Sequence, residues 1–72
     1  MDNQYWECQF TDGSSDDFRK KCTTVKEFGN GDMIQFKVTN GENYLTLAII
    51  PKSVIKKIVN HYDESLLDKL KG

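Results

Sequence analysis

The chain has few of the residues that usually carry chemistry, with two cysteines, one histidine and one proline among 72 residues. A structural zinc site needs four ligands, usually from paired Cys-x-x-Cys units, and Cys8 and Cys22 lack that spacing. A thiol nucleophile needs a nearby basic group, and nothing in the sequence places His61 beside a cysteine. We therefore expect no metal, no cofactor and no enzymatic activity, with both cysteines in or near the core.

Other shortages exclude further classes of protein. No stretch approaches the ~18 apolar residues of a membrane span, so we expect no membrane partner. Ten Lys and Arg stand against eleven Asp and Glu, a net charge of −1, whereas strong nucleic-acid binders usually carry an excess of basic residues. Residues 1–4 are acidic and polar, unlike a signal peptide, which predicts a cytoplasmic protein with reduced thiols.

The clearest element in the chain is a central hairpin. Residues 33–39 and 44–49 alternate apolar and polar side chains with period two, as strands do. Between them, Asn40-Gly41 is the preferred pair for a type I′ turn, and a two-residue loop there sets Lys37 opposite Tyr44. One face of this predicted hairpin is apolar and comprises Ile34, Phe36, Leu45, Leu47 and Ile49.

The C-terminal third has the spacing of an amphipathic helix. Its apolar residues recur three and four apart, and Pro51 suits a first helical turn. The stripe can continue to Leu70 as one helix, or break near Asp63 into two. The residues that mark the stripe are Val54, Ile55, Ile58, Val59 and Tyr62, with Lys52, Lys56 and Lys57 on the outer side.

The first third predicts one strand and leaves one segment open. Residues 4–11 alternate and read as a strand, followed by a turn at Asp12-Gly13. Residues 17–28 fit a strand, which the Cys-Thr-Thr-Val run favours, or a helix with Phe18 on its stripe.

The predicted fold is a single α+β domain over residues 1–72, an antiparallel four-stranded meander (4–11, 17–27, 32–39, 43–50) packed against a C-terminal helix. The alternative order is β-α-β-β-α. The predicted core comprises Trp6, Cys8, Phe10, Ile34, Phe36, Leu45, Leu47, Ile49, Val54, Ile55, Ile58, Val59 and Tyr62.

The order of strands, a last strand ending Leu-Ala-Ile-Ile-Pro and a helix over Val54–Leu70 loosely resembles the Positive Cofactor Four family of single-strand nucleic-acid binders. The likeness covers residues 25–70 in pattern. It implies a four-stranded sheet and a C-terminal helix that form a dimer.

The second face of the predicted sheet is the candidate binding surface, because one helix covers only one side. The predicted site comprises Tyr44, Lys37, Gln35, Thr46, Met33 and Tyr5. We expect a small non-catalytic protein that acts through a protein partner or self-association, typical of regulators and inhibitors, including those of phages and mobile elements. The alternative is a single-stranded nucleic-acid binder, with bases stacked on Tyr44 and Tyr5 and with Lys37 and Lys26 near phosphates.

Overall fold

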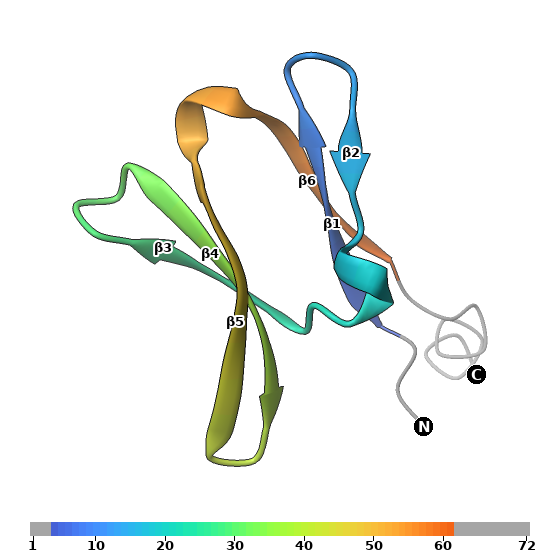
Figure 1. The fold of residues 1–72 in the computed structure, drawn as a ribbon, viewed down its shortest axis with the longest axis vertical. Helices are drawn as coiled ribbons and strands as arrows, with labels where there is room; N and C mark the ends of the chain where they lie inside the picture. The colour runs from blue at the N-terminus through green and yellow to red at the C-terminus, as the bar shows by residue number, and fades with distance from the viewer. Residues whose placement is uncertain (1–3, 62–72) are drawn as a thin grey trace, which may run out of the picture.

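A computed structural model describes residues 4–61, which form strands and two short 3₁₀ turns (Figure 1). The elements, in chain order, are β1 (Tyr5–Phe10), β2 (Ser15–Asp16), η1 (Phe18–Lys20), β3 (Thr24–Phe28), β4 (Met33–Asn40), β5 (Asn43–Pro51), η2 (Lys52–Val54) and β6 (Ile55–His61).

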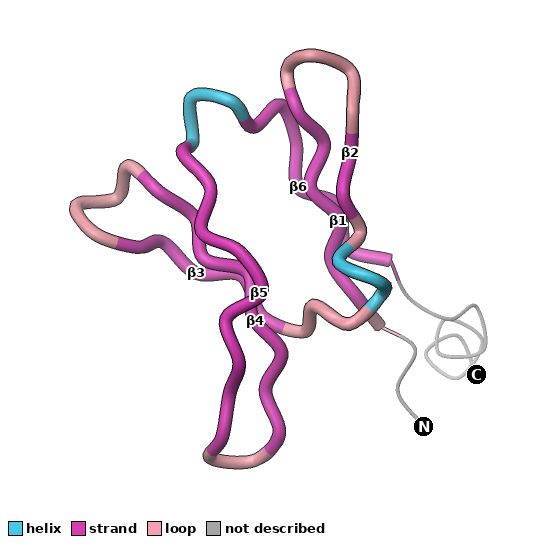
Figure 2. Tube along the Cα trace, viewed as in Figure 1, coloured by secondary structure: helices cyan, strands magenta, loops and turns pink. Residues whose placement is uncertain are grey.

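The strands form two antiparallel three-stranded sheets, ordered β2-β1-β6 and β3-β4-β5. Strands dominate the tube in Figure 2, and the β4–β5 hairpin reaches well beyond the first sheet. The core lies between the sheets. Its buried members are Cys8, Phe18, Cys22, Ile34 and Phe36, and the half-buried residues packed on them are Trp6, Phe10, Val25, Leu47, Ala48, Ile50, Ile55 and Ile58.

The predicted C-terminal helix is wrong over residues 55–61, which form β6 and pair with β1. The register of this pair shifts between Gln9 and Phe10, which leaves Lys56 as an extra residue on β6. Such a bulge lets Ile55 and Ile58 both face the core although they are three residues apart, a spacing that also fits a helix. The predicted α+β class is therefore wrong for the described residues, and the resemblance to the Positive Cofactor Four family loses its helix. Residues 62–72 lie outside the described part.

The central hairpin is confirmed, but its turn lies one residue later than predicted. Asn40 pairs with Asn43, so Gly41 and Glu42 occupy the turn, and Gly41 has a φ of 64°. The pairing slips by two residues, so that Lys37 lies opposite Thr46 rather than Tyr44. A slip of two keeps every side chain on its predicted face, because the side-chain period of a strand is two.

A bulge in β5 then reverses the expected faces. The register shifts between Phe36 and Lys37, which pair with Ala48 and Thr46 and leave Leu47 as the extra residue. After this point Ala48 and Ile50 pack on the core, whereas Ile49 pairs with Gln35 and is 38% exposed. The prediction that Ile49 lies in the core is therefore wrong, because one inserted residue inverts the alternation.

Residues 17–28 are neither one strand nor one helix. They begin with η1, in which Phe18, Arg19 and Lys20 have φ values of 53°, 57° and 61°. The carboxylates of Asp16 and Asp17 accept the backbone N–H groups of Phe18 and Arg19 at 2.8 and 3.1 Å. The left-handed turn places the Phe18 ring against Phe36, with centroids 4.7 Å apart. The chain then enters β3, which pairs with β4.

The predicted core is correct between the sheets and wrong for residues near strand ends or on the far side of the first sheet. Leu45 and Val54 are 63% and 41% exposed, because Leu45 lies near the hairpin tip and Val54 lies in η2. Val59 pairs with Glu7, on the side of the first sheet away from Cys8. The prediction for Tyr62 falls outside the described residues.

Candidate functional site

The side of the β3–β4–β5 sheet that faces away from the core is the candidate site, and we call it the outer face. Its strands are held in register by continuous pairing from Thr24↔Lys37 to Phe28↔Met33 and from Lys37↔Thr46 to Thr39↔Tyr44. The residues of this face are Thr24, Lys26, Phe28, Met33, Gln35, Lys37, Thr39, Tyr44, Thr46 and Ile49.

Tyr44 is the most exposed aromatic side chain of this face, at 61%. The Lys37 ammonium nitrogen lies over its ring, 4.6 Å from the centroid. Such a cation–π contact at an exposed site contributes roughly 0.5–1 kcal/mol. Because Lys37 and Tyr44 are diagonal neighbours on β4 and β5, the sheet itself presents them together as an aromatic and cationic pair.

Polar side chains fix the middle and one end of the outer face. The Gln35 side chain is buried and donates from Nε2 to the Thr46 hydroxyl at 2.8 Å. Just before the start of β3, the Thr23 hydroxyl accepts a hydrogen bond from the backbone N–H of Thr39 at 2.9 Å. These cross-strand bonds hold the side chains in one arrangement, so a partner that binds here loses little conformational entropy in ordering them.

Apolar side chains occupy the opposite end of the outer face. Phe28 is 44% exposed and pairs with Met33, and Ile49 is 38% exposed beside Gln35. The charged residues of the outer face are Lys26 and Lys37, and within the described strands no carboxylate belongs to it. The surface thus combines exposed aromatic and apolar side chains, which interfaces are enriched in, with positive charge.

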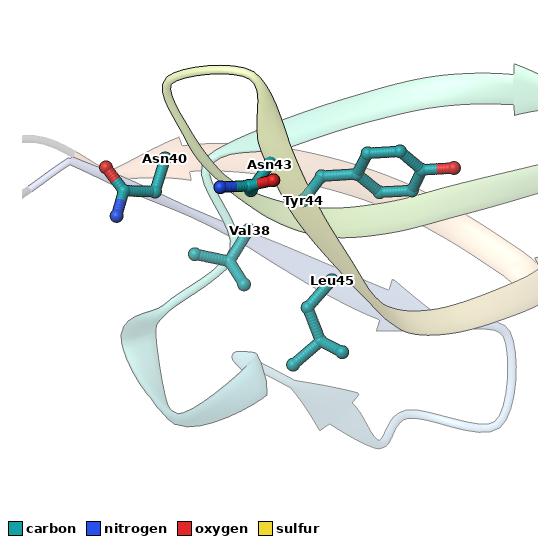
Figure 3. Close-up of a pocket in the computed structure, with 5 residues that line it drawn as sticks. All are labelled: Val38, Asn40, Asn43, Tyr44 and Leu45. Carbon is teal, nitrogen blue, oxygen red and sulfur yellow. The ribbon is translucent and has the colours of Figure 1, made fainter.

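A shallow hollow of about 220 Å³ lies at the tip of the β4–β5 hairpin (Figure 3). It is lined by Val38, Asn40, Asn43, Tyr44 and Leu45. Figure 3 shows Val38 and Leu45 projecting to the same side of the ribbon, while the Tyr44 ring extends along it. The tip therefore exposes apolar side chains on both of its faces, although its loop residues are polar.

Tyr5 lies apart from the other predicted site residues, on β1 of the first sheet. Its ring stacks on that of His61, with centroids 4.8 Å apart, and His61 Nε2 lies 2.6 Å from a carboxylate oxygen of Glu7. The hydrogen bond with His61 lowers the pKa of Glu7, with smaller contributions from Ser15 and from the charge of His61. Tyr5 is therefore part of an aromatic and hydrogen-bonded cluster that ties β1 to β6.

The structure brings together five of the six predicted site residues on the outer face and adds five others. Met33, Gln35, Lys37, Tyr44 and Thr46 all belong to the outer face. One of the added residues, Lys26, was named only for the nucleic-acid alternative, and the site prediction missed the other four, Thr24, Phe28, Thr39 and Ile49. Thr24 and Phe28 were hidden because residues 17–28 were ambiguous, and Ile49 because the bulge is not visible in the hydrophobic pattern.

The three lysines predicted on the outer side of a helix lie instead around a second hollow, of about 350 Å³. Lys52 also pairs with Glu27 at 2.5 Å, and this hydrogen bond lowers the pKa of Glu27. The hollow is lined by Ile34, Lys52, Ile55, Lys56, Lys57 and Ile58.

Cys8 and Cys22 are both fully buried free thiols, which confirms their predicted place in the core. Burial raises the pKa of each thiol, which disfavours the reactive thiolate. Among residues 4–61, no three His, Cys, Asp or Glu side chains gather as metal ligands would.

Comparisons with protein-family models, curated proteins and solved structures find no match for this chain. The part of the chain that the structure describes contains no helix of the length and apolarity needed to cross a membrane.

Proposed function

We propose that this chain is a small non-catalytic regulatory protein that binds a protein partner through the outer face of the β3–β4–β5 sheet. The observation that carries the proposal is the exposure of Phe28, Tyr44 and Ile49 on one face, at 44%, 61% and 38%. Aromatic side chains are enriched at interface cores, and a few such anchors provide most of the binding energy.

The charge of the outer face indicates the kind of partner. Lys26 and Lys37 are its charged residues, so a partner surface with carboxylates around an apolar centre complements it. The lysine held over Tyr44 can pair with such a carboxylate while the ring contacts an apolar group. We therefore expect binding to weaken with salt, but less steeply than phosphate-driven binding does.

The test compares variants of the outer face with a matched control elsewhere. Tyr44→Ala and Lys37→Glu should keep the fold, because neither side chain contributes to the core, and should lose capture of the partner that the parent binds. Loss of an aromatic anchor typically costs ~2 kcal/mol or more, about a thirtyfold weaker complex. Val54→Ala truncates a similarly exposed apolar side chain in η2, which lies off this face, and should bind like the parent.

Circular dichroism checks the fold, and affinity capture from lysate followed by mass spectrometry identifies the proteins that the parent retains. If Tyr44→Ala, Lys37→Glu and Val54→Ala all retain the same proteins as the parent, the outer face is not the binding surface.

A second candidate function is binding of single-stranded nucleic acid on the same face. It is favoured by Lys26 and Lys37 beside the exposed rings of Phe28 and Tyr44, with no carboxylate among the described residues of the face. Bases stack on such rings, and lysines neutralise phosphates. Tyr5, expected to stack a base, instead stacks on His61 in the other sheet, so Phe28 takes its place. A titration with oligonucleotides separates the two functions, since phosphate-driven binding must fall steeply as salt rises.

A further inference from the structure

The exposed edges of the two sheets differ in how they are protected against strand pairing. In the described chain these edges are β2, β3, β5 and β6. Charged side chains on an edge strand discourage pairing with another chain. Asp16 lies on the two-residue β2, Lys26 and Glu27 lie on β3, and Lys56 and Lys57 lie on β6. The nine residues of β5 contain no charged side chain; the bulge at Leu47 and Pro51 protect its later part, so Asn43–Thr46 is its unprotected stretch.

Among the described residues, this stretch of β5 also belongs to the part of the hairpin that has no third strand beside it. The third strand, β3, pairs with β4 only as far as Thr24↔Lys37, so the hairpin continues beyond Lys37 as a two-stranded ribbon. Within this ribbon Tyr44 is 61% exposed on the outer face and Leu45 is 63% exposed on the other. A two-stranded ribbon is marginal in water, and a further strand beside β5 would contact both side chains.

We propose that the edge of β5 pairs antiparallel with β5 of a second copy of this chain. The absence of charge suits this occupant, because in a two-fold antiparallel pair the residues at the axis face their own copies, and a charge there would meet a like charge. In β5 every antiparallel register avoids that repulsion.

The size of the core gives a second reason for self-association. Among residues 4–61 five apolar residues are buried, and small domains are often stabilised by oligomerisation. The pairing also closes, because it uses the β5 edge of both copies and leaves charged β3 edges at the two ends of a six-stranded sheet. The proposal concerns the strand edge and does not rest on the proposed function of the outer face.

The test is sedimentation velocity of the full chain over a wide range of concentration. The parent should sediment as a dimer that dissociates on dilution. Leu45→Lys adds a charge to the exposed edge near the hairpin tip without removing a core contact, and should raise the dissociation constant at least tenfold. Val54→Lys adds the same charge to a similarly exposed apolar residue away from the edge, and should dimerise like the parent. Lys37→Glu, which tests the outer face, should also remain dimeric.

Amide hydrogen exchange provides a measurement that needs no variant. Backbone amides of β5 should exchange more slowly in concentrated than in dilute protein, whereas the amides of β3 should not change. If Leu45→Lys fails to fold, this concentration dependence decides the question. A parent that stays monomeric at every concentration, or whose β5 exchange does not depend on concentration, would overturn the proposal, and so would a Leu45→Lys variant that folds and dimerises like the parent.

Discussion

Two adjacent isoleucines in β5 allow a direct test of the fold, because the hydrophobic pattern and the structure assign them opposite roles. Simple alternation along the strand places Ile49 in the core. The bulge at Leu47 turns Ile50 toward the core and leaves Ile49 38% exposed. The substitutions Ile49→Ala and Ile50→Ala remove the same atoms from neighbouring positions, so each variant is the control for the other.

The expected magnitudes follow from burial. A buried Ile→Ala change costs 2–5 kcal/mol, and half-buried Ile50 belongs at the low end, about 2 kcal/mol. Ile49 loses mainly strand propensity and partial contacts, about 1 kcal/mol or less. The total free energy of unfolding for this length is roughly 4–11 kcal/mol, so both variants should fold. In a domain of this size each kcal/mol shifts Tm by about 4–8 °C, so Ile50→Ala should melt at least 4 °C below Ile49→Ala.

Urea and thermal unfolding followed by circular dichroism measure this difference. Equal losses, or a larger loss for Ile49→Ala, would mean that the strand alternates without a bulge and that the β4–β5 register described above is incorrect. The same Ile49→Ala protein should also bind the proposed partner less tightly, since Ile49 lies on the outer face.

Three further predictions concern the turns and one ion pair. Gly41→Val should lower the free energy of unfolding by about 1–2 kcal/mol in a urea titration. Gly41 has a φ of 64° and a Cβ there meets no other atom, so the cost lies in the backbone conformation alone. An unchanged urea midpoint would contradict the positive φ of Gly41 in the hairpin turn. Arg19→Gly should raise the melting temperature by a few degrees. The left-handed backbone conformation of Arg19 costs about 1–2 kcal/mol, which exceeds the entropy cost of glycine, about 0.5–1 kcal/mol. A lower melting temperature would argue against the left-handed turn. The hydrogen bond with His61 lowers the pKa of Glu7, so the contribution of Glu7 to stability is present above the ordinary pKa of about 4.3 and lost as pH falls through the folded value. Glu7→Gln should therefore reduce the loss of stability on acidification below about pH 4. A pH profile of stability identical to that of the parent would refute this.

Much of the central hairpin could be predicted because its signals are local. Alternating side chains in residues 33–39 and 44–47 lie on faces that depend only on the two-residue period of a strand, and they kept those faces although the turn moved by one residue. The grouping of Lys37, Gln35 and Thr46 on one face followed from the same period. The burial of Cys8 and Phe36 also agrees with simple alternation.

What the tertiary structure decided is where the chain departs from strict alternation and which distant strands pair. The spacing of Ile55 and Ile58 fits a helix as well as a bulged strand, and pairing with β1, about 50 positions earlier in the chain, selects the strand. Backbone pairing with β1 satisfies the polar groups of β6 that face β1 and turns both isoleucines into the core between the sheets. The bulge at Leu47 likewise depends on how β5 fits against β4 and the core, and it moves Ile49 from the predicted core to the outer face. Local patterns determined which side chains share a face within each unbroken run of alternation, whereas non-local pairing determined where the alternation breaks and which face is buried.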